Sequence, residues 1–113
     1  MPHEGRELSY LWDMQHAARE ISQFMQGVKF SQFEKEKILR LAAERELLII
    51  GEAANHLSPQ FRNKHPEIRW VNFIGLRNTL AHEYGETLIN KVWVAATVSV
   101  PELLAELDKL LPE

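Results

Sequence analysis

The chain has 113 residues, of which 45% are hydrophobic and 26% charged, and its formal net charge at pH 7 is −3. These values predict one globular domain spanning residues 1–113, and they exclude a disordered chain and a broad basic surface for nucleic acid. Because the sequence contains no cysteine, disulfide frameworks, thiolate zinc sites and cysteine nucleophiles are excluded as well.

No apolar run approaches the roughly 18 residues that a membrane span requires, and the first residues do not resemble a signal peptide. The sequence also shows no internal repeat and no low-complexity segment. We therefore expect a cytoplasmic protein that has no membrane partner.

The first predicted helix covers residues 6–26, where apolar residues recur at steps of three and four, and Gly27 ends it. Ser31 and Glu34 have the spacing of a capping box, so a long second helix is predicted over residues 31–56, at the centre of the fold. The residues expected to face inward are Leu8, Leu11, Trp12, Ala18, Ile21, Phe24 and Met25 in the first helix and Ile38, Leu41, Ala42, Leu48, Ile49 and Ala53 in the second.

Two charged residues, Arg45 and Glu52, lie on or beside the inward stripe of the second helix. A charge in that position needs an oppositely charged partner or a water-filled edge, and an ion pair within the chain is the simpler expectation. Gly51 lowers helix propensity at the same place, which is the pattern expected where another helix packs closely.

Residues 57–69 are polar and contain two prolines, so they predict a connection with at most one short helical turn. A third helix is predicted over residues 70–84 with Phe73, Leu76 and Leu80 on its core stripe, and Gly85 is a typical stop. The last helix starts near residue 86, and Pro101 is expected to force a kink or a restart. Its inward residues are predicted to be Leu88, Val92, Ala95, Ala96, Leu103, Leu104, Leu107, Leu110 and Leu111.

The valines of the last segment favour strands, but its length and periodicity favour a helix. With helical spacing nearly throughout and no hairpin signal, the sequence predicts an all-α fold, a four- or five-helix up-and-down bundle.

Four functional side chains stand near the end of the third predicted helix. Asn78 and His82 are one turn apart on one face, while Arg77 and Tyr84, seven residues apart, are expected to share a second stripe. A chemical site is one interpretation, and favourable electrostatics of arginine and histidine at a helix C-terminus is the other. The remaining histidines, His3, His16, His56 and His65, show no comparable pattern.

The motif Arg-x4-His-x-Tyr, written here as Arg77-Asn-Thr-Leu-Ala-His82-Glu-Tyr84, resembles the signature of the HepT branch of HEPN-domain proteins. The resemblance extends over nearly the whole chain. It includes Asp13, residues 45–54, Trp70, Gly75-Leu76 and Val92-Trp93.

The resemblance implies a helical-bundle toxin that forms a homodimer and cleaves RNA without a metal or another cofactor, with Arg77 and His82 in the catalytic core. It also implies that a minimal nucleotidyltransferase antitoxin silences the toxin by AMPylation of Tyr84. The residue after this tyrosine is often aromatic in the family, whereas this chain has Gly85, so the local shape there is expected to differ.

This chemistry suits the residues present. Cleavage needs a base for the 2′-hydroxyl, an acid for the leaving 5′-oxygen and positive charge beside the phosphorane. A histidine serves as base or acid near neutral pH, and a guanidinium binds two phosphate oxygens. Because one histidine cannot easily do both jobs, we expect a two-fold dimer to combine two copies of the motif, with Asn78 orienting His82 or binding phosphate.

Residues 58–84 carry a local charge of +2 against −5 for the rest of the chain. Their basic residues Arg62, Lys64 and Arg69 are therefore the expected RNA-binding residues. The alternative to an enzyme is a non-catalytic helical module that binds or assists a nucleotidyltransferase partner. No RNA-binding motif with stacking aromatics is present in the sequence.

Overall fold

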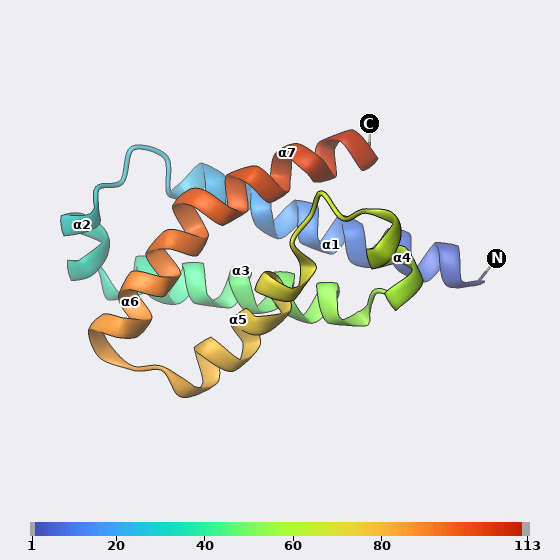
Figure 1. The fold of residues 1–113 in the computed structure, drawn as a ribbon. Coiled ribbons are helices and arrows are strands. Elements are labelled where there is room, and N and C mark those ends of the chain that lie inside the picture. Colours follow the sequence, from blue (N-terminus) through green and yellow to red (C-terminus); the bar gives the residue numbers. More distant parts are fainter. Residues whose placement is uncertain (1, 112–113) are drawn as a thin grey trace.

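The computed structural model describes the backbone of residues 2–111 and the side chains of residues 6–111. Its elements are, in chain order, α1 (Pro2–Phe24), α2 (Phe30–Lys35), α3 (Lys37–His56), α4 (Pro59–Lys64), α5 (Trp70–His82), α6 (Gly85–Val94), the π turn η1 (Ala95–Ser99) and α7 (Val100–Leu110) (Figure 1). No strand occurs within residues 2–111. The all-α prediction is confirmed.

Four long segments alternate in direction: α1, α3, α5 and the continuous helix formed by α6, η1 and α7 (Figure 1). The central position predicted for the second helix is confirmed for α3, which packs against both α1 and α5, while α7 returns along α1. The short helices α2 and α4 lie in the connections. The architecture is therefore the predicted up-and-down bundle with two additional short helices.

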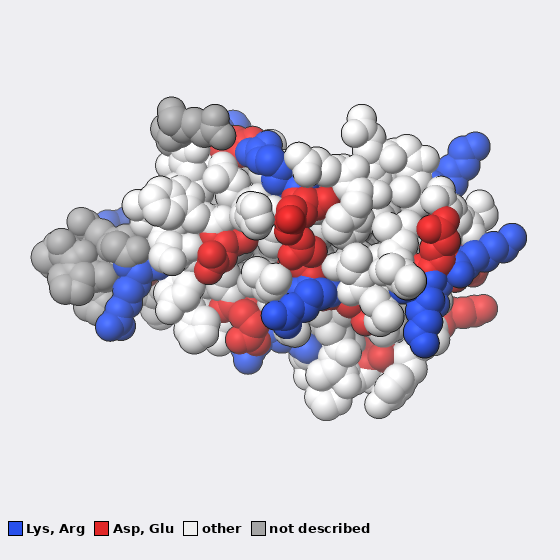
Figure 2. All heavy atoms as spheres, turned by 180° about the vertical axis from the view of Figure 1, so that it is seen from behind, with Lys and Arg blue, Asp and Glu red and all other residues white. Residues whose placement is uncertain are grey.

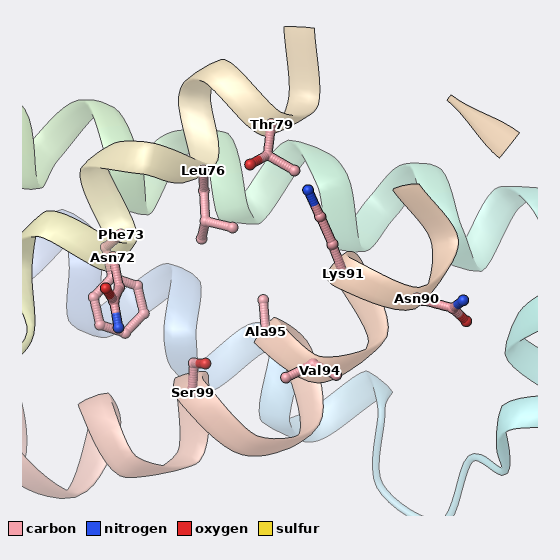
Figure 3. A pocket seen from close by; sticks show the side chains of 9 residues that line it. All are labelled: Asn72, Phe73, Leu76, Thr79, Asn90, Lys91, Val94, Ala95 and Ser99. Carbon is pink, nitrogen blue, oxygen red and sulfur yellow. The ribbon is translucent and has the colours of Figure 1, made fainter. Parts of the chain in front are cut away.

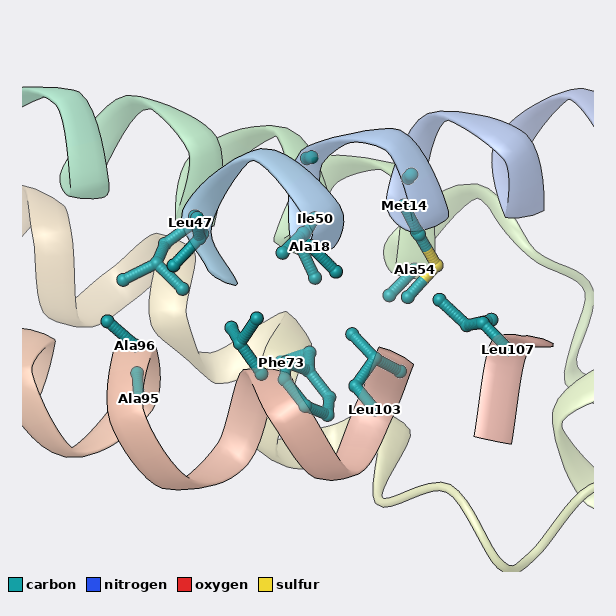
Figure 4. Close-up of a cluster of buried hydrophobic side chains, with 14 of the residues drawn as sticks. Met14, Ala18, Leu47, Ile50, Ala54, Phe73, Ala95, Ala96, Leu103 and Leu107 are labelled. Atoms are coloured by element: carbon teal, nitrogen blue, oxygen red, sulfur yellow. The ribbon is translucent and has the colours of Figure 1, made fainter. Parts of the chain in front are cut away.

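The core lies between α1, α3, α5 and the last long helix (Figure 4). The buried face of α3 is displaced by about one residue from the predicted one. Ile38, predicted to face inward, is 84% exposed, whereas Leu47 and Ile50 are fully buried. Apolar residues occupy two neighbouring faces of this helix, so periodicity alone does not fix which of them is buried. Leu8, Trp12 and Leu41, also predicted inside, are exposed as well.

The predicted capping box at Ser31 is wrong. Helix α2 already begins at Phe30, after Lys29, and the chain leaves helical geometry at Glu36 before α3 starts. The break places Phe33 in the core, with its ring centroid 5.4 Å from that of Trp93. Aromatic packing with a distant helix therefore decides the break.

The short turn expected in the connection is confirmed as α4. Its N-terminus is capped by Ser58, whose hydroxyl accepts a hydrogen bond from the backbone N–H of Phe61 at 3.0 Å. Pro59 follows at the first helical position, where a missing N–H has no consequence.

Helix α5 ends at His82, two residues before the predicted end, because Glu83 and Tyr84 are extended. Gly85 has φ +58°, a left-handed conformation that favours glycine, and it begins α6. The turn between α5 and α6 is therefore only two residues long, Glu83 and Tyr84.

The helix from Gly85 to Leu110 passes without interruption through the π turn η1, where the N–H of Val100 donates to the carbonyl of Ala95. Pro101 was expected to force a kink or a restart of the helix. In the structure the helix instead continues, and it changes to π geometry just before Pro101. By length and composition alone this helix is able to cross a membrane. Core helices share these properties, and its residues Val92, Ala95, Ala96 and Val100 are buried in the bundle.

Candidate functional site

Arg77 lies on the side of α5 that faces α3. Its Nε donates to Oε1 of Glu52 at 2.5 Å, and the two side chains are 39% and 44% exposed. The ion pair expected for Glu52 is confirmed, with Arg77 as its partner. A charged hydrogen bond of this kind holds the guanidinium in one orientation at the surface.

Gly51 allows this arrangement. A Cβ atom at this position would lie 2.8 Å from the carbonyl oxygen of Phe73 and 3.0 Å from Cγ of Arg77. The close helix packing predicted at Gly51 is confirmed. Because the backbone of α5 approaches so closely, Arg77 lies directly against the next residue of α3, Glu52.

Asn78 and His82 lie on the solvent side of α5, and both are exposed. Arg77 and His82 are five residues apart, so their side chains leave the helix axis in directions that differ by about 140°. Within one chain the structure therefore brings Asn78 and His82 to one face and turns Arg77 to another.

Tyr84 is 80% exposed and lies in the extended turn, just before α6. The prediction that it shares a helical stripe with Arg77 is wrong, because α5 ends before Tyr84. The preceding Glu83 forms an ion pair with Lys91 of α6, with 3.5 Å between Oε2 and Nζ. This pair fixes the direction in which the turn leaves His82.

The predicted RNA-binding residues lie at the other end of α5. Arg62 and Lys64 belong to α4, which is joined to α5 by hydrogen bonds from the indole N–H of Trp70 to the carbonyls of Arg62 and His65. Arg69 precedes α5, so the helix separates it from His82 by roughly 20 Å. Arg69 also borders a cavity whose other charged residues are acidic, namely Glu67, Glu102 and Glu106.

Two further hollows lie beside α5 and α3. A cavity of about 370 Å³ between α5 and the last long helix is lined mainly by apolar groups, with Thr79 and Lys91 at one end (Figure 3). A second cavity of about 290 Å³ lies between α1 and α3 and includes Asp13, Arg45 and Glu52. Sequence reasoning missed both cavities; the only signal for the second was that these three residues fall within the family resemblance.

Two carboxylates, those of Glu20 and Glu46, meet between α1 and α3. Burial and a hydrogen bond with Glu20 of α1 raise the pKa of Glu46 in α3 from 4.5 to about 7. Burial also raises the pKa of Glu44. On the described part of the rear face, acidic and basic side chains alternate, without a field of one sign (Figure 2). Among the described residues, no group of three or more histidine and carboxylate side chains is placed to hold a metal ion.

A family model described as "Ribonuclease HepT-like" matches residues 14–110. The chain is 31% identical over 100 residues to a "Putative RNase" of Methanocaldococcus jannaschii, which covers 88% of this chain and 92% of the relative. It is 32% identical over 101 residues to a "Probable ribonuclease HepT" of Thermococcus cleftensis, covering 89% and 92%. No solved structure shows significant similarity to the chain.

Proposed function

The chain belongs to the HepT-like ribonuclease family, and from this premise we propose that it is a metal-independent endoribonuclease, the toxin of a two-gene toxin–antitoxin system. The observation that carries the proposal is the exposure of Asn78 and His82 at the end of α5, on the helix that also carries Arg77, whose orientation is set by Glu52. The proposed place of action is the cytoplasm.

In the proposed reaction His82 takes the proton of the 2′-hydroxyl, whose oxygen then attacks the adjacent phosphorus. The bond from phosphorus to the 5′-oxygen breaks, and an acid returns a proton to that oxygen. Arg77 stabilises the negative charge on the phosphorane with its guanidinium donors. Asn78, one turn before His82, orients the imidazole or binds a phosphate oxygen.

A homodimer supplies what one chain lacks, since Arg77 and His82 of the same α5 point in different directions. The solvent face of α5 carries Val71, Gly75, Asn78 and His82, and Val71 is 79% exposed although apolar. We place the two-fold axis beside this face, so that one cleft between the subunits contains His82 and Arg77 from both of them. One histidine then acts as base and the other as acid.

Tyr84 is the proposed point of control by a minimal nucleotidyltransferase antitoxin. Its hydroxyl oxygen attacks the α-phosphorus of ATP, pyrophosphate leaves and the phenolic proton passes to solvent. The exposure of Tyr84 supports access by such an enzyme. The attached AMP places an anion two residues from His82, where it competes with RNA phosphate.

The basic residues Arg62, Lys64 and Arg69 retain a proposed role as a distal grip for RNA. At roughly 20 Å from His82 along α5, they reach phosphates a few nucleotides away from the cut.

The first test is cleavage of RNA in EDTA by the wild-type protein, by His82→Ala and by His16→Ala, an exposed histidine of α1 that serves as the matched control. We expect the wild type and His16→Ala to cut and His82→Ala to be inactive. Incubation with the cognate nucleotidyltransferase and ATP should add the mass of AMP to Tyr84 and stop cleavage. A pure, metal-free wild type that cuts no RNA would favour the non-catalytic module that binds a nucleotidyltransferase.

The dimer is tested separately by sedimentation of two glutamate variants. Val71→Glu places a charge on the proposed interface, and Val98→Glu places one on another exposed valine, in η1, which is 52% exposed. We expect Val71→Glu to sediment as a monomer and Val98→Glu to remain a dimer. A dimer that survives Val71→Glu would contradict this arrangement.

A further inference from the structure

The cavity between α1 and α3 has the shape and lining of a small binding site. Its floor is apolar, formed by Leu48, Ile49 and Ala53 of α3. At one end the rings of Tyr10 and His56 are stacked, with centroids 5.1 Å apart and planes 15° apart. A volume of about 290 Å³ is at the lower limit for ligand pockets, which suits a flat group better than a whole nucleotide.

The rim of this cavity is charged but balanced. Asp13 and Glu52 supply two carboxylates, Arg45 lies beside them, and Glu52 is also bound by Arg77 of α5. Two negative and two positive groups favour an uncharged ligand that presents hydrogen-bond donors to the carboxylates. Because Glu52 is already engaged by Arg77, Asp13 is the carboxylate available to such a ligand.

The geometry points to a subsite for one nucleobase of the RNA, next to the phosphate that Arg77 binds. This inference rests on the proposed function, since it takes Arg77 as part of the cleavage site. The base lies on the apolar floor beside the Tyr10–His56 stack, in the way that proteins commonly hold unpaired RNA bases. Arg45 and Arg77 are then placed for the phosphates on either side of it.

The carboxylate of Asp13 determines which base fits. An ionised carboxylate only accepts hydrogen bonds, so it selects bases whose edges carry N–H donors. Guanine presents two adjacent donors, N1–H and the 2-amino group, which match both carboxylate oxygens. Adenine and cytosine each offer an amino group, whereas uracil offers a single N–H. The expected order of preference therefore begins with guanine and ends with uracil.

The test uses the His82→Ala protein, which leaves RNA uncut, and fluorescein-labelled RNA hexamers. One hexamer contains only uridine, and the others carry a single central guanosine, adenosine or cytidine. We expect the guanosine hexamer to bind about tenfold more tightly than the uridine hexamer, since one bidentate contact typically discriminates by at least that factor. Adding Asp13→Asn should abolish the preference for guanosine over uridine.

Asp108→Asn, which alters an exposed aspartate of α7, is the matched control and should keep the preference. Titration of guanosine monophosphate into the wild type gives a second readout, the shift of the His56 ring resonance, which uridine monophosphate should not produce. Equal binding of all hexamers, no binding of any of them, or a preference that survives Asp13→Asn would overturn the subsite. Cleavage by the wild type is scored separately, so a protein that prefers guanosine but does not cut keeps the subsite and loses the proposed reaction.

Discussion

Arg77 uses its Nε–H for Glu52 and keeps the other donors of its guanidinium for a ligand. Glu52 is therefore a positioning residue. It does not contact the substrate in the proposed reaction, but it sets the plane of the Arg77 guanidinium, which does. Because the Arg77–Glu52 pair is half exposed, it contributes little to the free energy of unfolding, and its main effect is to orient the guanidinium.

Glu52→Gln should therefore lower kcat/KM for RNA while leaving the thermal midpoint almost unchanged. We expect a loss of roughly five- to tenfold, since neutralising one partner of a half-exposed charged hydrogen bond costs about 1 kcal/mol. Glu34→Gln, an exposed glutamate of α2, is the matched control. In an Arg77→Lys background the effect of Glu52→Gln should shrink; an equal loss there would show that Glu52 does not act through Arg77.

The Glu20–Glu46 contact predicts a stability that depends on pH. The pKa of Glu46 is raised to about 7 in the fold, from 4.5, by burial and by Glu20. The stabilisation is complete below the lower value and is lost as the pH rises through about 7. His16 faces Glu20 at 3.6 Å and the charge of Arg45 opposes the shift, so both reduce the effect.

The thermal midpoint of the wild type should fall between pH 5 and pH 8, by roughly a few degrees. Glu46→Gln keeps a hydrogen-bonding group without the titration, so its midpoint should change less over the same range. Differential scanning calorimetry of both proteins measures the difference. Parallel curves would mean that the two carboxylates do not share a proton.

At the scale of single residues, the sequence predicted which candidate residues share a helix face but not which residues of other helices contact them. The spacing of Asn78 and His82 placed them correctly on one face, because a helix fixes that relation locally. Glu52 was predicted to need a partner, but its partner, Arg77, lies on another helix. The position of Tyr84 was predicted wrongly because α5 ends two residues earlier than expected, and helix ends are the least certain part of such a prediction.

At the scale of secondary-structure elements, the close packing of α3 against α5 depends on the absence of a side chain at Gly51. Gly51→Ala would bring a methyl group to 2.8 Å from a backbone oxygen of α5, which cannot move away alone. We expect a loss of about 1–3 kcal/mol of stability and weaker RNA cleavage, because Arg77 moves with α5.

Gly75→Ala is the stability control within α5, since nothing in the same subunit lies within 4 Å of a Cβ atom there. Because Gly75 lies on the proposed dimer face, both variants are compared in the Val71→Glu background. Gly75→Ala should raise stability slightly, by about 0.5–1 kcal/mol, because alanine favours the helix more than glycine does. Chemical denaturation measures both variants. A Gly51→Ala protein as stable as the wild type would mean that α3 and α5 separate without cost.

The order and direction of the helices were predictable because each long segment carries a periodic apolar pattern. The break between α2 and α3 was not, since Ser31 and Glu34 suggested a start that the packing of Phe33 on Trp93 overrides. The choice of the buried face on α3 was missed for a related reason. Several consecutive apolar residues place apolar side chains on two faces of α3. Which face is buried then depends on the helices that pack against it.

For the molecule as a whole, the negative net charge and the distribution of basic residues predict modest binding of RNA. The proposed grip formed by Arg62 and Lys64 lies near one end of α5 and the proposed reaction site at the other, so only longer RNA substrates would reach both. The acidic residues Glu102 and Glu106 beside Arg69 could not be predicted, because they belong to α7, which is distant from Arg69 in the sequence.

Arg62→Gln combined with Lys64→Gln should weaken binding of a twelve-nucleotide RNA to the His82→Ala protein. The slope of log affinity against log salt should decrease by about 1.4, as expected for two lost contacts to single-stranded phosphates. Binding of a tetranucleotide should not change, because it does not reach α4. An unchanged slope for the longer RNA would remove these residues from the interface.

The π turn η1 has a consequence for the evolution of the last helix. A π turn holds about one residue more than an α turn, so everything after it is rotated back by roughly 100°. In a regular helix Leu103 and Leu107 would lie about 20° and 60° from Val92 on one side, and the π turn moves both by about 100° toward the side of Ala95. Removing Val98 together with Pro101→Ala should therefore yield a regular helix that keeps the same core residues buried. Removing the exposed Ala105 instead should turn Leu107 out of the core and unfold the bundle at lower temperature.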